Sequence, residues 1–346
     1  MSAAYERRWE SRRGGGRGGR SAGDEARDSY YDVPPIHGPH WKWLIIGYFF
    51  CGGIAGASYV VASVAQFLGG DANRRIARAG RYVSFAALLP CPPLLVLDLG
   101  RPERFHHMLR VFKFRSPMSV GTWGLTVFGG FCTLSALIQA AQDGLLGRAT
   151  LPARLLRNLP ARLIGALGAG PAFFFSGYTG VLLAATAVPL WTRNYLLMGP
   201  LFLASAASNA TAAIALVLAL ARGTPRHTLE RLERLDSLAL LAELGLLLTL
   251  RARLGPTLAR PLVEGRLGRL YRAGVLGLGL VAPLALQAGG LLRRGGPSRV
   301  STAMASGLVL AGGLTFRYVI VMAGRASADD PRATFELTKG GDDMGA

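Results

Sequence analysis

The chain has 346 residues, of which 51% are hydrophobic and only 17% are charged, yet its formal net charge is +19. Soluble domains carry about 25% charged residues, so this composition argues against a soluble enzyme. The positive charge is nearly all arginine, and the arginines flank long apolar runs instead of alternating with exposed aromatic residues. This pattern favours membrane-flanking charge over a nucleic-acid-binding surface, and no nucleic-acid partner is expected.

Residues 1–39 form an Arg/Gly-rich tail ahead of the first apolar run. The tail contains Arg12-Arg13-Gly14-Gly15-Gly16-Arg17 and few apolar residues, which predicts a disordered segment. Ser11-Arg12-Arg13 matches the start of a twin-arginine export signal, but the first apolar run begins only near Trp41 and continues too long for a signal core. No cleaved signal is therefore predicted.

Eight apolar runs follow the tail, and most reach the roughly 20 residues that a helix needs to cross a hydrocarbon core. They lie at 43–68, 81–98, 119–141, 164–190, 197–221, 237–250, 273–291 and 302–322. The sixth run has a short apolar centre and reaches this length only between Leu235 and Leu254. Lipid offers no hydrogen bonds to the backbone, so runs of this kind predict helices.

The expected fold is therefore an all-α, polytopic integral membrane protein with about eight transmembrane helices. The membrane domain is expected over residues 40–325, followed by a polar C-terminal tail at 326–346. An even number of spans puts both termini on one side of the membrane. The balance of lysine and arginine favours the cytoplasm for that side only through the N-terminal tail, so orientation stays open.

Two of the spans carry residues that shape helices. Pro90, Pro92 and Pro93 should break and bend the second span. In the first span, Gly52-Gly53 and Gly56 are small residues four apart, which let neighbouring helices approach closely. We interpret the glycines as packing residues.

The cysteines and histidines argue against a metal or haem centre. The three cysteines lie far apart, each within an apolar run, and no pair has the spacing of a metal- or cluster-binding motif. None of the histidines lies in the middle of an apolar run, where an axial haem ligand would have to stand. They are His37, His40, His106, His107 and His227. We expect neither haem nor an iron–sulfur cluster in this chain.

Asp98 is the sharpest candidate for chemistry, because it ends the proline-bent second span at the membrane boundary. Arg101 and Arg104 follow it closely, so the carboxylate could pair locally, with Gly100 and Pro102 fixing the turn. A structural salt-bridged loop and a functional carboxylate explain this spacing equally well.

Ionisable residues also lie inside later spans. Glu243 in the sixth span and Arg317 in the eighth could meet across the bundle, either to stabilise the packing of the helices or as a step in a proton path. Asn209 and Gln287 lie mid-span and are expected to form structural hydrogen bonds between helices.

Four further side chains suit a site near the membrane surface. Tyr178 lies in the fourth span, where its hydroxyl needs a partner, either another helix or a quinone carbonyl. His40 precedes Trp41 at headgroup level and could exchange a proton with a lipid-borne head group or serve as an anchor. His106 and His107 are weaker candidates of the same kind.

A set of distinct motifs is spread from about residue 40 to residue 326. They are Gly52-Gly53-Ile54-Ala55-Gly56, Asp98-Leu99-Gly100-Arg101-Pro102, Ser116-Pro117-Met118-Ser119-Val120-Gly121-Thr122-Trp123, Tyr178-Thr179-Gly180-Val181-Leu182-Leu183 with Val188-Pro189-Leu190-Trp191, Gly199-Pro200-Leu201-Phe202-Leu203-Ala204-Ser205, and Arg317-Tyr318-Val319-Ile320-Val321 with Ala323-Gly324-Arg325. With them the chain resembles the NrfD/PsrC family, the membrane subunits of polysulfide reductase and related respiratory complexes. The Asp-Leu-Gly-Arg-Pro and Ser-Pro-Met-Ser stretches are specific, whereas the glycine pairs alone are not.

The resemblance implies a haem-free membrane anchor of eight helices in two four-helix bundles, located in the bacterial cytoplasmic membrane. Such subunits bind menaquinone or ubiquinone near one membrane face. They exchange electrons with an iron–sulfur, ferredoxin-like subunit docked there, which in many cases serves a molybdoenzyme-type catalytic subunit. The implied face carries the N-terminus and lies outside the cytoplasm in the polysulfide-reductase type, whereas the charge balance leans the other way.

The resemblance also implies positions for the quinone site. In related proteins a histidine near the start of the first span, the aspartate after the second and a tyrosine in the fourth lie near the quinone. The matching positions are His40, with His37 as a rival, Asp98 and Tyr178. Arg101, within the motif of the aspartate, is assigned to the same site.

Three functions fit these observations. The leading hypothesis is a quinone-reactive anchor of a membrane oxidoreductase. The second is a proton-translocating subunit that uses Glu243 and Arg317 as a proton path, and the third is a purely structural anchor for soluble subunits. The sequence names neither the terminal substrate of the complex nor the direction of electron flow.

Overall fold

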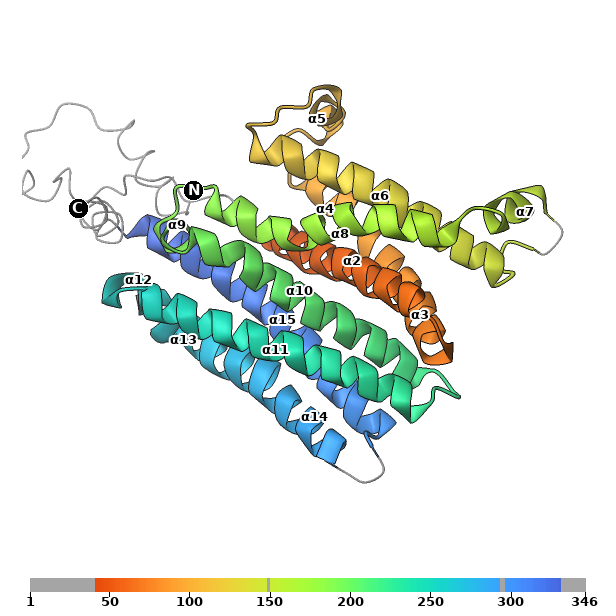
Figure 1. The fold of residues 1–346 in the computed structure, drawn as a ribbon. Coiled ribbons are helices and arrows are strands. Elements are labelled where there is room, and N and C mark those ends of the chain that lie inside the picture. The colour runs from red at the N-terminus through yellow and green to blue at the C-terminus, as the bar shows by residue number, and fades with distance from the viewer. Residues whose placement is uncertain (1–40, 148–149, 293–295, 331–346) are drawn as a thin grey trace, which may run out of the picture.

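The computed structural model describes residues 41–147, 150–292 and 296–330. Within these residues the chain forms long, roughly parallel helices joined by short connections, and it contains no strand (Figure 1). The predicted tail at 1–39, and His40 with it, lies outside the described residues, as does most of the predicted C-terminal tail.

The first half of the chain forms a four-helix bundle. Its members are α2 (Trp43–Leu68), α3 (Asp71–Leu88) continued by α4 (Cys91–Leu97), α6 (Pro117–Gln142) and α8 (Ala161–Ala184). α2 packs against α3 and α8, and α6 packs against α3 and α8, which closes the bundle. Short helices lie in its connections: η3 (Pro102–Arg104), α5 (His107–Arg110) and α7 (Leu151–Arg157).

The second half forms another bundle of the same kind. Its members are α10 (Tyr195–Leu220), α11 (Arg226–Arg253), the continuous run of α13 (Gly265–Arg269), π-helical η4 (Leu270–Val281) and α14 (Ala282–Leu292), and α15 (Arg299–Asp329). The short helices α9 (Pro189–Arg193) and α12 (Pro256–Val263) precede α10 and α13. The expectation of an all-α membrane protein with two four-helix bundles is confirmed.

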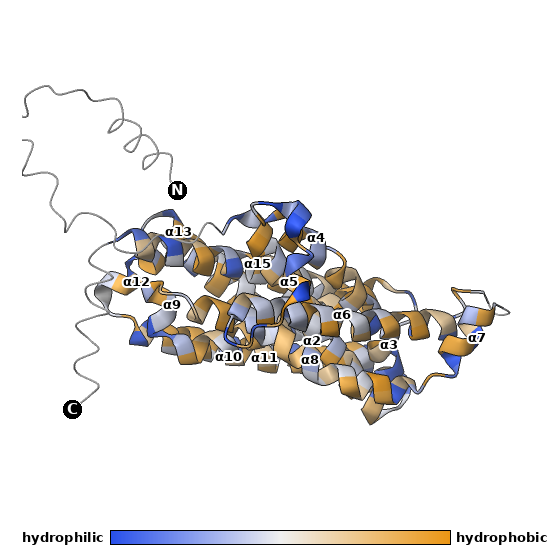
Figure 2. Cartoon of the chain, turned by 90° about the horizontal axis from the view of Figure 1, so that it is seen from above, coloured by the Kyte–Doolittle hydropathy of each residue, from blue (hydrophilic) through white to orange (hydrophobic). Residues whose placement is uncertain are grey.

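We name the two ends of the molecule by an aspartate at each. The Asp98 face is the end at which α2, α6 and α10 begin and at which α4, α8 and α15 end; α5, α9 and α12 lie there (Figure 1). The Asp143 face is the opposite end, at which α2 and α6 end and near which α7 lies. Between the two faces, the long helices carry hydrophobic residues over most of their length (Figure 2).

Seven of the described helical segments are long and apolar enough to cross a membrane. The eighth long helix, α11, has 28 residues and packs against α10 and α14 inside the second bundle. Its charged residues lower its hydropathy, but Asp236 and Glu243 face the protein and are buried. The expected number of about eight helices therefore corresponds to seven apolar spans and α11.

Some predicted span boundaries were wrong. The second helix begins at Asp71, ten residues before the predicted start at 81, because its first turns bury small and apolar side chains while their arginines face outward. The fourth helix ends at Ala184, before the predicted 190, since Pro189 favours an extended conformation at Val188. The predicted break at the prolines is confirmed: α3 ends at Leu88 and α4 carries Pro92 and Pro93 in its first turn.

Small residues allow the closest helix contacts. A side chain on Gly56 of α2 would meet the backbone of α8 at the Ala172 carbonyl, 2.6 Å from its Cβ position. A side chain on Gly180 of α8 would similarly meet the Met198 carbonyl of α10. The interpretation of the first-span glycines as packing residues agrees with this geometry.

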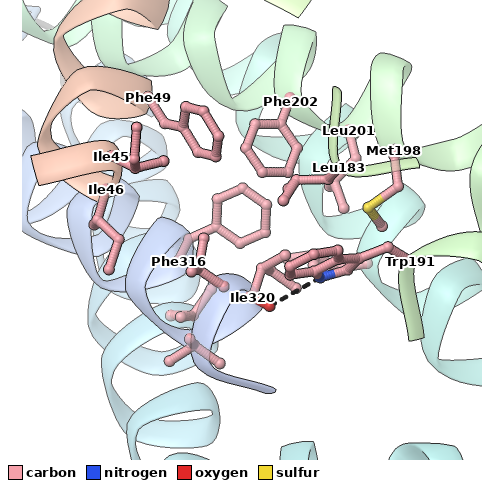
Figure 3. Packing of buried hydrophobic residues seen from close by; sticks show 14 of the residues in the cluster. Ile45, Ile46, Phe49, Leu183, Trp191, Met198, Leu201, Phe202, Phe316 and Ile320 are labelled. Atoms are coloured by element: carbon pink, nitrogen blue, oxygen red, sulfur yellow. Dashed lines mark hydrogen bonds between the residues drawn. The ribbon is translucent and has the colours of Figure 1, made fainter. Parts of the chain in front are cut away.

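Aromatic side chains join the two bundles near the Asp98 face (Figure 3). Phe202 of α10 packs between Phe49 of α2 and Phe316 of α15, with ring centroids 6.3 and 5.3 Å away. Trp191 of α9 donates a hydrogen bond from Nε1 to the Ile320 carbonyl at 3.1 Å. This shared core holds the start of α2 against the end of α15.

Candidate functional site

Asp98 lies at the C-terminal end of α4 and is half-buried. Burial raises the pKa of its carboxyl group, and the positive charge of Lys42, at the start of α2, opposes this effect. Because its neutral form is favoured, this carboxyl group is suited to gaining and losing a proton above the usual range of an aspartate.

The structure does not show the local ion pair that the spacing allowed. Among the described residues, Asp98 forms no ion pair with Arg101 or Arg104, and both arginines are exposed. Arg101 instead precedes η3, where its carbonyl accepts a hydrogen bond from the Arg104 amide at 3.1 Å. The short helix directs the arginines outward, so the reading as a salt-bridged loop is wrong.

An apolar cavity of about 350 Å³ lies beside the Asp98 loop. It is formed where the proline break bends the second span, between α3, α4, α6 and the connection that carries α5. Leu99 and Phe105 line its end at the Asp98 face, and Leu88, Thr122 and Thr133 line it deeper along the helices. A space of this size and polarity suits an apolar chain that enters from the bilayer.

Tyr178 is buried within the same bundle. Its hydroxyl donates a hydrogen bond to the Pro117 carbonyl at the start of α6, and its ring lies against Gly121. Of the two partners that the sequence left open for this hydroxyl, the structure supplies the helix. Tyr178 and Asp98 belong to the same end of the bundle.

Tyr48 is a buried side chain that the sequence analysis missed. It lies in α2, and its ring centroid is 6.2 Å from that of Phe175. Its hydroxyl has no hydrogen-bond partner among the described residues. A tyrosine inside an apolar run was a usable signal, because a hydroxyl in lipid requires a partner.

The histidine candidates are only partly described. His40 lies outside the described residues, but its neighbour Trp41 stacks on Trp191 with ring centroids 5.5 Å apart. His106 and His107 lie on and beside α5, exposed at the Asp98 face, with their rings 4.3 Å apart. The start of α2 therefore belongs to the same face as Asp98.

A second polar region lies inside the second bundle. Glu243 of α11 and Arg317 of α15 are both buried, and two serines of α10 stand between them. Arg317 Nη1 donates to Ser205 Oγ at 3.0 Å, and Ser208 Oγ donates to a carboxylate oxygen of Glu243 at 3.1 Å. The two charges are thus brought together across the bundle through hydroxyl groups.

Two more buried acids continue this region toward the Asp143 face. Gln287 donates from Nε2 to a carboxylate oxygen of Asp236 at 2.5 Å, and the Ser237 hydroxyl donates to the side-chain oxygen Oε1 of Gln287 at 2.7 Å. Glu233 accepts a hydrogen bond from the Thr302 hydroxyl at 2.6 Å. The expected interhelical hydrogen bond of Gln287 is confirmed, whereas Asn209 donates within its own helix, to the Ser205 carbonyl.

The sequence analysis missed Glu233, which lies before the sixth apolar run, and Asp236, which lies at the edge of that run once it is extended to Leu235. Their spacing was informative: residues 233, 236 and 243 are three and seven apart and share one face of a helix. The structure buries all three carboxylates, which we call the α11 acids. In the described part of the chain, no group of three or more metal-ligating side chains gathers closely enough to hold a metal ion.

Comparison with known proteins places these features in a family. The family model described as polysulphide reductase, NrfD, matches residues 35–328, which include all eight long helices. No curated protein matches the chain.

Proposed function

The chain belongs to the polysulphide reductase NrfD family, a family of membrane subunits of oxidoreductase complexes, and from this premise we propose that it reacts with quinone at the Asp98 face. In this proposal it is a haem-free anchor that exchanges electrons between menaquinone or ubiquinone and an iron–sulfur partner subunit. The proposal locates the complex in the bacterial cytoplasmic membrane, with a molybdoenzyme-type subunit carrying the terminal reaction.

One observation carries the proposal: Asp98, whose carboxyl group has a raised pKa, directly precedes Leu99, which lines an apolar cavity of about 350 Å³. The cavity suits an isoprenoid chain, and a quinone ring at its Leu99 end would lie beside Asp98. Oxidation of a quinol to a quinone releases two protons and two electrons. Asp98 would accept the two protons one after the other and pass each to water at the face, while the two electrons leave in turn for the partner's cluster.

The exposed loop after Asp98 supports a partner at this face. It carries five basic residues between 101 and 115, none of which forms an ion pair among the described residues: Arg101, Arg104, Arg110, Lys113 and Arg115. A positive surface of this kind favours docking of a protein with an acidic surface. Arg101 would act here in docking or in holding the loop, outside direct reach of Asp98.

Asp98→Asn in the assembled complex tests the proposal. We expect quinol-dependent turnover to fall by about 100-fold, because a positioned general base contributes factors of this order. Activity of the catalytic subunit with a soluble dye should be unchanged. Asp71→Asn, at an exposed carboxylate on the opposite face, is the matched control. Normal quinol turnover in the Asp98 variant contradicts the assignment, and a complex with neither bound quinone nor quinone-dependent activity supports a structural anchor.

A second candidate function, proton transfer through the second bundle, is favoured by the α11 acids. Together with Gln287, Ser208, Ser205 and Arg317 they form a line of buried polar groups from Thr302 near the Asp143 face toward α2. Arg317 Nε also donates to the Phe49 carbonyl at 3.3 Å, next to Tyr48. Such a line could deliver protons from one face to a quinone at the other.

Proton uptake by sealed vesicles during turnover distinguishes this function. Glu243→Gln should abolish the turnover-linked proton signal while quinol oxidation continues, since it removes a titratable group from the middle of the line. Glu230→Gln, at a partly exposed position on the same helix, is the control. An unchanged proton signal in the Glu243 variant argues against this route.

A further inference from the structure

Arg81 is a buried cation that neither proposed function uses. It lies in α3, in the first bundle, with only 4% of its surface exposed. Its guanidinium carbon stands 4.2 Å from the centre of the Tyr59 ring, and Nη2 donates to the side-chain oxygen of Gln66 at 3.1 Å. Its other terminal nitrogen, Nη1, has no hydrogen-bond partner among the described residues. This nitrogen is therefore free to donate to an acceptor from outside the described side chains.

The space beside Arg81 leads to the Asp143 face. A gap of about 10 Å³, enough for one water molecule, is bordered by Arg81, Ser135 and three glutamines. The same glutamines, Gln66, Gln139 and Gln142, line a cavity of about 450 Å³ directly above it. We call the gap and the larger cavity together the funnel. It lies between α2, α3, α6 and α8, and Arg81 lines only the gap, which we call its floor.

The rim of this funnel is positively charged. Arg74 and Arg78 of α3 and Arg162 of α8 line the larger cavity, and all three side chains are exposed. Gly69 and Gly70 of the α2–α3 turn also line it, and both have positive φ, so no bulkier side chain narrows the opening there.

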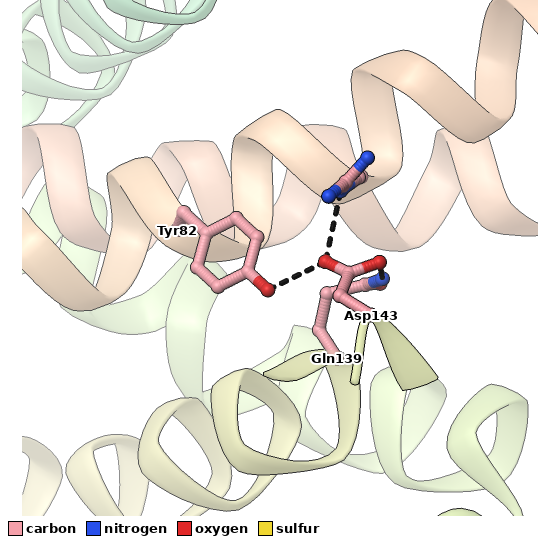
Figure 4. Close-up of polar contacts among 4 residues, drawn as sticks. Tyr82, Gln139 and Asp143 are labelled. Carbon is pink, nitrogen blue, oxygen red and sulfur yellow. Dashed lines mark hydrogen bonds and ion pairs between the residues drawn. The ribbon is translucent and has the colours of Figure 1, made fainter. Parts of the chain in front are cut away.

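The one acidic side chain that lines the funnel is already fully engaged. Asp143 accepts hydrogen bonds from Arg78 Nε at 2.8 Å, from the Tyr82 hydroxyl at 2.6 Å and from Gln139 Nε2 at 3.2 Å (Figure 4). It therefore neutralises Arg78 and leaves Arg81 and Arg162 without a carboxylate in the funnel. Arg74 pairs at 3.5 Å with Asp71, but both side chains are highly exposed and this pair is weak.

We propose that this funnel binds a phosphate-bearing anion, with Arg81 at its floor and Arg162 and Arg74 at its rim. Guanidinium and amide N–H groups match the geometry of phosphate oxygens. The funnel opens where lipid head groups lie, and the large apolar side chains of Phe67, Leu68 and Leu163 beside it are exposed. The head group of an anionic phospholipid and free phosphate share this chemistry, and the apolar rim favours the lipid.

The site lies at the opposite face from Asp98 and stands independently of the quinone proposal. Binding is measured without turnover, so a failure of either proposal leaves the other intact. The probes are phosphatidylglycerol, phosphatidylcholine and inorganic phosphate, added separately to the delipidated complex in detergent. Retained lipid is counted by native mass spectrometry, and phosphate binding by calorimetry.

We expect the complex to retain phosphatidylglycerol in preference to phosphatidylcholine. Arg162→Gln should weaken that binding about fivefold, the effect of one basic side chain near a membrane surface. Arg154→Gln, at an exposed arginine of α7 on the same face, should leave it unchanged. Arg81→Gln should weaken it further, and the Arg162 variant carries the test if the Arg81 variant fails to fold.

Each outcome decides the proposal. Retention of phosphatidylglycerol with no effect of phosphate identifies a lipid head-group site, and saturable phosphate binding without lipid selectivity identifies a free-anion site. Equal retention of both lipids together with no phosphate binding overturns the proposal. Equal effects of Arg162→Gln and Arg154→Gln also overturn it, since binding would then follow general surface charge.

Discussion

The two bundles bury arginine in opposite ways. In the first bundle, Arg81 has no carboxylate within ion-pair distance among the described residues and faces a funnel that opens at the Asp143 face. In the second bundle, Arg317 is enclosed by α2, α10 and α15, and Glu243 stands beyond two serines. The same charge therefore belongs to a closed polar network in one bundle and lies at the floor of an open funnel in the other.

This difference follows from the helix that faces each arginine. α11 brings three acids into the second bundle, whereas α6 and α8 bring serine, glutamine and glycine to Arg81. Removal of one partner from a closed network leaves a buried charge behind, but removal of an unpaired cation leaves none.

Arg317→Met should lower the free energy of unfolding in micelles by about 3 kcal/mol, because Ser205 and the Phe49 and Gly313 carbonyls lose a charged donor and Glu243, beyond the serines, loses the nearby cation. Arg81→Met is the matched variant in the other bundle, and its loss should be about 1 kcal/mol or less, since no buried acid is left behind. Reversible denaturation of both purified variants measures the difference. Equal losses would show that the two arginines are held in the same way.

Gly180→Ala should destabilise the contact between the bundles by about 1–3 kcal/mol, because the added methyl group overlaps the Met198 carbonyl of α10. Gly130→Ala, where the added group meets nothing within 4 Å, is the control and should stabilise α6 by about 0.5–1 kcal/mol. The same denaturation measurement applies. An unchanged free energy of unfolding in Gly180→Ala would mean that α8 and α10 can move apart at little cost.

The smallest expected effect is the pH dependence from Asp98. Its pKa is raised in the folded protein, so the carboxyl group stabilises the fold below its unfolded pKa of about 4. That contribution is lost as the pH rises through the folded pKa. Between pH 4 and pH 7 the unfolding free energy of the wild type should fall as the pH rises, and that of Asp98→Asn should fall less. Parallel curves would mean that Asp98 is as hydrated in the folded state as in the unfolded one.

The candidate residues show how far sequence patterns reached. Asp98 and Glu243 were identifiable because an ionisable group in or beside an apolar run is costly and therefore conspicuous. Arg81 and Asp236 were not, because each lies where charged residues were expected, at the edge of a predicted span. Only burial separates Arg81 from its exposed neighbour Arg78, and burial depends on which helices pack against that face of α3.

The sequence alone establishes that the chain is an all-helical, multi-pass membrane protein, because long apolar runs leave the backbone no other way to satisfy its hydrogen bonds in lipid. It also determined the proline break before Asp98. Only the tertiary structure decided which polar side chains meet. The pairing of Arg317 with Ser205, the burial of the α11 acids and the open funnel above Arg81 all arise from helix rotation and contact between segments distant in the chain. Such contacts depend on packing geometry, which local hydropathy does not encode.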